Sequence, residues 1–164
     1  MGRLAALGAA LMLMAVFAGP ALAAPSTVRA VIHEDFGKRA SARPCTPIDP
    51  QGVTCAGDGI VATVGRVTSS ADYVPDENVV RVIRFADGST VTVEETYSDP
   101  DFPGQSHDAP GSLKSYGNPL IQPFTWVVVG ATGAFAGATG SGTGTAVQAG
   151  DTLTFTFEGT VSTP

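Results

Sequence analysis

The chain has 164 residues, of which 43% are hydrophobic and 15% charged, and its formal net charge at pH 7 is −6. An acidic protein without clusters of lysine and arginine lacks the charge pattern that binds phosphate backbones, so nucleic acids and anionic membrane surfaces are not expected partners. The length suits one domain with its own hydrophobic core.

Residues 1–23 have the pattern of a secretory signal peptide. Arg3 precedes an apolar run over residues 4–17, which is followed by Gly19-Pro20 and by an A-x-A site that ends at Ala23. This order predicts cleavage after Ala23. The apolar run is short for a bilayer span, and residues 24–164 contain no second one. The sequence therefore predicts one secreted or cell-envelope domain over 24–164.

The two cysteines, Cys45 and Cys55, stand in a segment rich in proline and glycine. In an exported protein such a pair most simply forms one disulfide, whose chain-entropy contribution for so small a ring is ~3 kcal/mol. A metal site or a redox centre would need closer spacing or more ligands. We therefore expect a disulfide that closes a loop within residues 37–59.

Valine, threonine, glycine, phenylalanine and isoleucine dominate the rest of the chain, a composition that favours strands over helices. Two segments, 37–59 and 98–119, lack strand character, and a loop as long as the second is typically functional or disordered. The stretch 60–73 is long enough to bend at Gly65 or to divide. The predicted strands cover 28–36, 60–73, 79–86, 89–97, 122–130, 138–148 and 153–161.

The clearest local element is a hairpin around Asp87-Gly88, a dipeptide typical of a two-residue type I′ turn. Such a turn pairs Val82 with Val93 and places Arg81 opposite Glu94 as an exposed ion pair. The predicted inward face then consists of Val80, Val82, Val91, Val93, Glu95 and Tyr97.

Six to eight such strands, each expected to lie beside its neighbour in sequence, favour a single antiparallel up-and-down β-barrel of about eight strands. Closure into a barrel removes the exposed edges of the sheet and leaves an interior for side chains or one small ligand. An open β-sandwich is the alternative.

The most specific motif follows the apolar run Trp126 to Val129. It reads Gly-x-Thr-Gly-x-Phe-x-Gly-Ala-x-Gly, and Phe135 is expected to anchor its turn against the core. Together with the closing strand around Phe155 and Phe157, the motif resembles the allene oxide cyclase and dirigent-like barrels over about residues 125–161. Its residues are Gly130, Thr132, Gly133, Phe135, Gly137, Ala138 and Gly140.

The resemblance implies a calycin-like barrel whose lumen binds an apolar or phenolic small molecule. Some members steer the cyclisation of an allene oxide or the stereoselective coupling of radicals, and they do so without a cofactor, by holding a flexible substrate in a productive conformation. The motif residues are structural, and no lumen residue of the family aligns with this chain. If the protein is an enzyme, a cofactor-free isomerase or cyclase is expected.

Glu95 is the candidate acid or base, because a carboxylate on an apolar inward face has a raised pKa. The alternatives are a carboxylate in water at the barrel mouth or one paired with an arginine. Aromatic residues that could line a ligand pocket are Tyr73, Tyr97, Tyr116, Trp126, Phe155 and Phe157, although such aromatics are more often ordinary core or rim residues.

Metal and nucleophile chemistry find little support. His107 lies near Asp99, Asp101 and Asp108, but the spacing matches no calcium or zinc pattern, and a solvated acidic loop explains it. His33 stands alone, and neither a Gly-x-Ser-x-Gly elbow nor a nucleotide-binding motif is present. No metal or cofactor is expected.

Two functions therefore remain. The first is a barrel that binds an apolar small molecule in its lumen and either only binds it or also steers a cyclisation or isomerisation. The second is a non-catalytic envelope protein with a filled barrel and partner-binding loops. A continuous apolar cavity of roughly 300 Å³ or more favours the first, and a packed interior favours the second. The oligomeric state is left open.

Overall fold

The computed structural model describes residues 24–35, 45–48, 52–74, 77–98, 120–149 and 152–164. The predicted signal peptide and nearly all of the loop 98–119 lie outside the described residues. Among the described residues no helix has the length and apolarity needed to cross a membrane. The elements are β1 (Ser26–Asp35), β2 (Cys45–Ile48), β3 (Gly52–Val61), β4 (Gly65–Tyr73), β5 (Val79–Phe85), β6 (Thr90–Tyr97), β7 (Leu120–Thr132), a short 3-10 helix η3 (Gly133–Phe135), β8 (Thr139–Ala149) and β9 (Thr152–Ser162).

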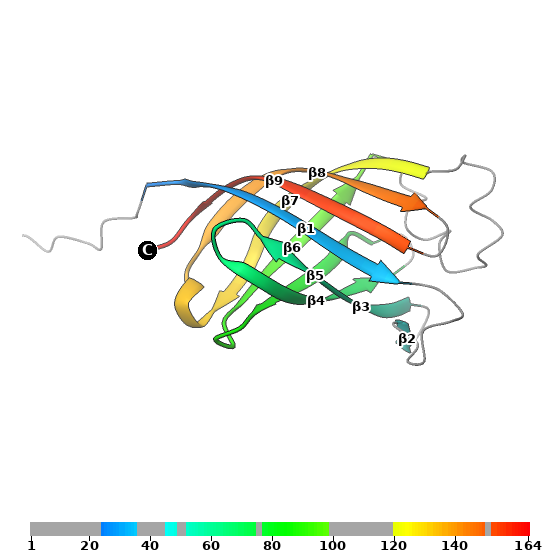
Figure 1. Cartoon of the computed structure of the whole chain (residues 1–164), viewed down its shortest axis with the longest axis horizontal. Helices are drawn as coiled ribbons and strands as arrows, with labels where there is room; N and C mark the ends of the chain where they lie inside the picture. Colours follow the sequence, from blue (N-terminus) through cyan, green and yellow to red (C-terminus); the bar gives the residue numbers. More distant parts are fainter. Residues whose placement is uncertain (1–23, 36–44, 49–51, 75–76, 99–119, 150–151) are drawn as a thin grey trace, which may run out of the picture.

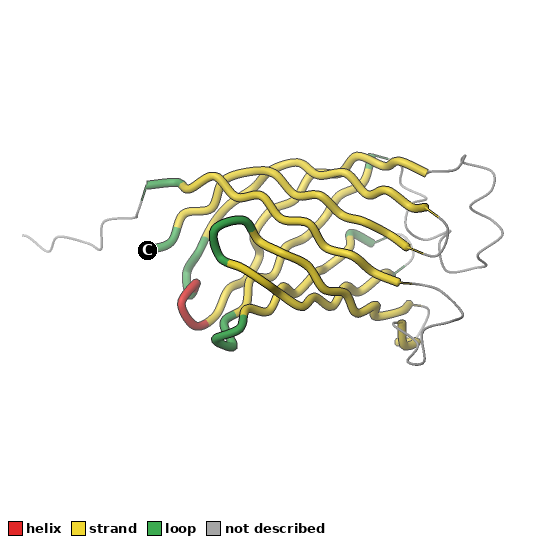
Figure 2. Tube along the Cα trace, viewed as in Figure 1, coloured by secondary structure: helices red, strands yellow, loops and turns green. Residues whose placement is uncertain are grey.

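The strands form one closed antiparallel barrel (Figures 1 and 2). Their order around the sheet is β1-β9-β8-β7-β6-β5-β4-β3-β2, and an additional pairing of β1 with β3 completes the circle. β1 pairs with the second half of β3, over Gly57–Val61, whereas β2 pairs with its first half, over Gly52–Cys55. Eight strands therefore form the wall and β2 is an appendage, so the predicted barrel is confirmed and the sandwich alternative is wrong.

The stretch 60–73 divides as one alternative predicted, because a turn at residues 62–64 separates β3 from β4. The prediction that 37–59 lacks strands is wrong, since β2 and most of β3 lie there. β3 resembles a loop in sequence because it contains Gly57 and Gly59. Both glycines are needed: a Cβ at Gly59 would collide with the carbonyl oxygen of Val31, and one at Gly57 would lie 2.7 Å from that of His33.

The disulfide between Cys45 and Cys55 forms as predicted. It joins two directly opposed residues of β2 and β3 rather than closing an irregular loop. The short β2 is thereby held against the part of β3 that β1 does not cover.

The predicted register of the β5–β6 hairpin is wrong by one residue. The Phe85 N–H donates to the Ser89 carbonyl at 2.9 Å, so the loop has three residues, with Gly88 at φ +85°. Asp87-Gly88 thus belongs to a turn with a left-handed glycine at its end rather than to a two-residue type I′ turn. On β5 the fully inward residues are Val79, Arg81 and Ile83, whereas Val80 is 36% exposed.

The glycine-rich turn between β7 and β8 closes the same end of the barrel as the β5–β6 hairpin. Gly133 and Gly137 have φ of +62° and +78°, which favours glycine at both positions. The ring of Phe135 packs on Phe85 with centroids 4.5 Å apart, and the Ala134 N–H donates to the Ser89 hydroxyl at 2.9 Å. The predicted anchoring role of Phe135 is confirmed.

Candidate functional site

The barrel lumen has an apolar half and a charged half. The apolar half lies toward the turns β3–β4, β5–β6 and β7–β8 and contains a cavity of about 80 Å³. All thirteen residues that line this cavity are apolar, and they include Ile83, Val93, Trp126, Phe135 and Phe157. This half can hold only a small, uncharged group.

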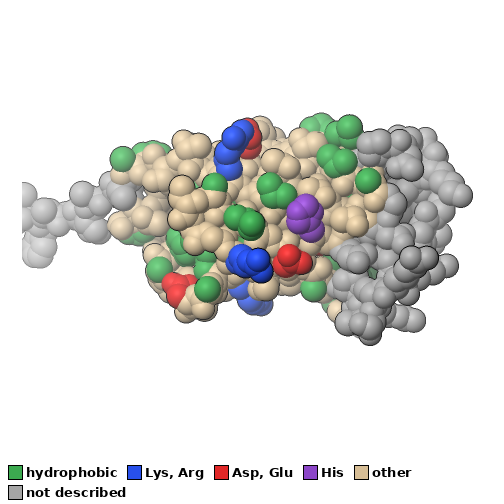
Figure 3. Space-filling view, viewed as in Figure 1, with side chains coloured by type: hydrophobic (Ala, Val, Ile, Leu, Met, Phe, Trp, Pro, Cys, Tyr) green, Lys and Arg blue, Asp and Glu red, His purple; other side chains and the backbone are tan. Residues whose placement is uncertain are grey.

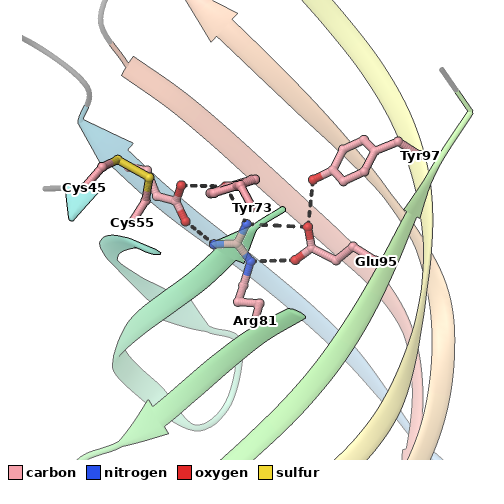
Figure 4. A network of polar contacts seen from close by, with 7 residues as sticks. Cys45, Cys55, Tyr73, Arg81, Glu95 and Tyr97 are labelled. Atoms are coloured by element: carbon pink, nitrogen blue, oxygen red, sulfur yellow. Dashed lines mark hydrogen bonds and ion pairs between the residues drawn. A yellow bond between two sulfur atoms is a disulfide. The ribbon is translucent and has the colours of Figure 1, made fainter. Parts of the chain in front are cut away.

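The charged half is organised around Arg81 on β5, whose side chain is completely buried (Figure 4). Its Nε donates to Glu95 Oε1 at 2.5 Å, and Nη1 donates to Glu34 Oε1 in a second ion pair. The guanidinium carbon lies 4.0 Å from the centroid of the Phe155 ring. One cation is therefore shared by two carboxylates from β1 and β6.

Two tyrosine hydroxyls complete this network. The Tyr73 hydroxyl donates to Glu34 Oε2 at 2.7 Å, and the Tyr97 hydroxyl donates to Glu95 Oε2 at 2.7 Å. Arg81 Nη2 reaches the Tyr73 oxygen at 3.2 Å. The result is a buried chain, Tyr73–Glu34–Arg81–Glu95–Tyr97, drawn from β1, β4, β5 and β6.

Burial sets the protonation of this chain. Desolvation raises the pKa of the Glu34 carboxyl, and the nearby Arg81 charge opposes that shift only in part. The pKa values of Tyr73 and Tyr97 lie well above their usual range, because burial and the adjacent carboxylates disfavour tyrosinate. Burial favours a neutral Arg81, but the two carboxylates outweigh it and raise its pKa well above the usual value. Arg81 therefore stays cationic, and Glu34 holds a proton more readily than an ordinary glutamate.

Glu95 faces the lumen as predicted and is completely buried, but its partner is Arg81, one of the alternatives that the sequence left open. The predicted exposed pair of Arg81 with Glu94 is wrong, because the register shift turns Arg81 inward. Glu94 instead accepts a hydrogen bond from Asn78 at 2.7 Å. Sequence reasoning missed Glu34, whose signal is its place in the alternation Ala30, Ile32, Glu34 along β1.

The structure describes five of the predicted aromatic residues, and all five are buried and face the lumen. Trp126 and Phe157 line the apolar cavity, whereas Tyr73, Tyr97 and Phe155 belong to the charged half. Tyr116 and His107 lie outside the described residues. His33 lies on the outer wall, where its Nδ1 is 3.0 Å from the Thr154 hydroxyl. Within the described ranges, no three His, Cys, Asp or Glu side chains gather into a metal-binding group.

Glycines beneath Trp126 determine how much lumen its ring occupies. A Cβ at Gly142 or Gly159 would lie 2.7 or 2.5 Å from the indole, so the bare backbone of β8 and β9 lets the ring lie against the wall. The indole N–H donates to the Thr143 carbonyl at 3.1 Å, which fixes this position. The large aromatic residues still leave a cavity well below 300 Å³.

Comparison with known proteins identifies the fold. No protein-family model matches the chain, and no curated protein matches it in sequence. Among solved structures, the chain is similar to the pterocarpan synthase dirigent protein GePTS1. The structural alignment covers 96% of this chain and 99% of that protein, with a TM-score of 0.56 and 13% sequence identity. The fold is a dirigent-like barrel. At this identity the likeness concerns the fold, and the resemblance to allene oxide cyclases stays a prediction.

Proposed function

We propose that this dirigent-like barrel binds the apolar end of a small molecule in its lumen, without a covalent bond. The observation that carries the proposal is the cavity at the turn end of the barrel, whose lining is entirely apolar. Such a lining recognises its occupant by burial of apolar surface alone. Val64 belongs to the lining and is 54% exposed, so the cavity reaches the outer surface at the β3–β4 turn.

The size of the cavity limits the occupant. Sites that enclose whole drug-sized ligands measure roughly 300–1,000 Å³, and an apolar cavity of about 150 Å³ accommodates benzene. A volume of about 80 Å³ holds less than that, such as the end of an alkyl chain or the edge of a ring. We therefore propose that the rest of the ligand lies outside the lumen, between Val64 and Phe135.

A catalytic role would require the bound molecule to react inside the lumen. A barrel of this kind steers a cyclisation or isomerisation by holding the substrate in one conformation, and a polar group then assists the reaction. Glu95 is the predicted acid or base, but its oxygens already accept hydrogen bonds from Arg81 and Tyr97. A substrate would have to displace the Tyr97 hydroxyl to reach it. The geometry therefore supports binding best, and catalysis by Glu95 stays a prediction.

We also propose that the mature protein lies outside the cytoplasm. The disulfide between Cys45 and Cys55 supports this location, because such bonds persist in oxidising compartments. The predicted signal peptide supports it independently.

Toluene is a suitable probe, because its methyl group and ring edge are small enough for the cavity while the rest of the ring stays outside, as proposed for the ligand. Val91 is 8% exposed and lines the cavity, so Val91→Phe fills it, whereas Val129→Phe adds the same ring at a position that is 53% exposed. We expect toluene to shift the methyl NMR signals of Ile83 and Val93 in the wild type and in Val129→Phe, but not in Val91→Phe. A circular dichroism melt verifies that both variants fold. Toluene shifts that persist in Val91→Phe would place the binding site elsewhere.

A second candidate is a non-catalytic protein of the cell envelope with a filled barrel. It is favoured by the cavity volume of about 80 Å³, which lies below the roughly 300 Å³ expected of a ligand site. It is also favoured by the charged network, whose groups satisfy one another without any ligand. Native mass spectrometry of protein recovered from its own host separates the two functions. A retained apolar molecule supports lumen binding, whereas an empty protein that also ignores toluene supports the filled barrel.

A further inference from the structure

A groove of about 940 Å³ runs over the outer wall of the barrel, across β1, β3, β4 and β5. Figure 3 shows this face, where basic, acidic and apolar side chains lie close together near the middle of the molecule. The groove opens on the outer wall, whereas the cavity on which the proposed function rests lies in the lumen; the two share only Ala30 and Phe85 in their linings. Its volume falls in the range of small-molecule sites.

Positive charge is concentrated in this groove. The described residues contain four arginines and no lysine, and Arg81 is buried in the lumen. The other three, Arg29, Arg66 and Arg84, all line the groove. Among the described residues, the groove is therefore the cationic face of a chain whose net charge is −6.

Two of these arginines are not held in an ion pair by the described residues, although Asp58 is a diagonal neighbour of Arg66 across β3 and β4. Arg29 forms an ion pair with Glu158, but neither Arg66 nor Arg84 makes an ion pair with any residue that the structure describes. Thr68 pairs with Arg84 across β4 and β5, which makes Arg66 and Arg84 diagonal neighbours on adjacent strands. Like charges so placed repel each other, and a bound anion would relieve that repulsion.

Apolar side chains lie beside this charge pair. Val31 and Ile60 are directly opposed across β1 and β3, and they are 39% and 58% exposed. Ile60 is in turn paired with Arg66 across β3 and β4. The groove therefore offers an apolar surface that ends at two guanidinium groups without an ion pair to any described residue.

We propose that the groove binds a small amphiphilic carboxylate. Its carboxylate contacts Arg66 and Arg84, because the planar guanidinium forms paired hydrogen bonds with that group. Its alkyl or aromatic part covers Val31 and Ile60. Asp58, the one acidic residue of the lining, lies opposite His33 and diagonally from Arg66, so the carboxylate is expected on the side of the arginine pair that faces Arg84.

Octanoate tests the proposal, with octanol and acetate as probes that lack the charge or the chain. Calorimetry gives the affinity, and amide NMR shifts locate the bound probe. We expect octanoate to shift residues of β1, β3 and β4 along the groove and to bind at least tenfold more tightly than either control. The double variant Arg66→Gln/Arg84→Gln is expected to weaken octanoate binding by at least about tenfold.

A matched pair of variants tests the apolar part. Ile60 and Ile121 are both 58% exposed, but only Ile60 lines the groove. Ile60→Ser is therefore expected to weaken octanoate binding severalfold, whereas Ile121→Ser leaves it unchanged. Equal effects of the two variants would overturn the proposal.

Three further results would also overturn it. The first is octanol that binds as tightly as octanoate, because the arginines would then not select the ligand. The second is octanoate that shifts the signals of lumen residues such as Val93 and not those of the groove. The latter result would count in favour of the lumen proposal instead. If sedimentation shows self-association without octanoate that Arg66→Gln/Arg84→Gln abolishes, the occupant of the groove is a second copy of this chain.

Discussion

At the scale of single residues, the balance of charge around Arg81 decides what each substitution costs. The guanidinium and both carboxylates are completely buried. Removing the cation leaves two buried carboxylates without a counter-charge, whereas removing the Glu95 carboxylate leaves Arg81 in a neutral pair with Glu34. A lone buried charge is strongly unfavourable, so the two kinds of variant differ in cost.

We therefore predict that Arg81→Met lowers the free energy of unfolding by about 3–5 kcal/mol. Glu95→Gln should cost clearly less, since Arg81 keeps Glu34 and the amide still accepts a hydrogen bond. The triple variant Glu34→Gln/Arg81→Met/Glu95→Gln should recover much of the loss. Urea unfolding measures all three, and a Glu95→Gln variant as unstable as Arg81→Met would contradict this account.

The same residues show where sequence reasoning stops. The inward face of β6, with Glu95 on it, follows from the alternation of apolar residues. β5 has apolar residues on both faces, Val80 and Val82 on one and Val79 and Ile83 on the other, so its pattern fixes no register. An inward Arg81 is compensated by Glu95 of the same hairpin and by Glu34 from 47 positions away. Local patterns carry no information about the contact with Glu34.

At the scale of elements, close strand approach closes the barrel. β1 and β3 meet where Gly59 has no room for a Cβ against the backbone of Val31. The sequence predicted β1 but missed most of β3, because strand propensity penalises the glycines that the seam requires. The same glycines that weaken a strand in isolation allow this one to complete the sheet.

Gly59→Ala should therefore destabilise the protein by about 1–3 kcal/mol, the usual cost of overpacking. Gly130→Ala is the matched control, because the nearest atom to its Cβ would be 3.6 Å away and its φ is not positive. We expect that control to stay within about 0.5 kcal/mol of the wild type. Hydrogen exchange should show faster opening of β1 and β3 in Gly59→Ala alone. Equal losses in the two variants would mean that the seam tolerates a methyl group.

At the scale of the whole molecule, the buried network links global stability to pH. The pKa values of Tyr73 and Tyr97 are raised in the folded protein, so above pH 10 the unfolded chain loses protons that the folded chain retains. The stability contributed by these two groups is complete below pH 10 and is lost as the pH rises through their folded pKa values. Glu34 affects stability in the same direction at acidic pH. Its contribution to the free energy of unfolding is complete below its ordinary pKa of 4.5 and falls as the pH rises through its raised pKa.

We expect the free energy of unfolding to fall above pH 10 by up to about 1.4 kcal/mol per pH unit for each buried tyrosine. Two of the chain's three tyrosines should ionise only as the protein unfolds, so tyrosinate absorbance and circular dichroism should change together. The variant Tyr73→Phe/Tyr97→Phe is less stable at neutral pH but should have a flatter alkaline slope, and the slope is the decisive quantity. Gradual ionisation of all three tyrosines in a folded protein would show that water reaches the network from the charged end of the barrel.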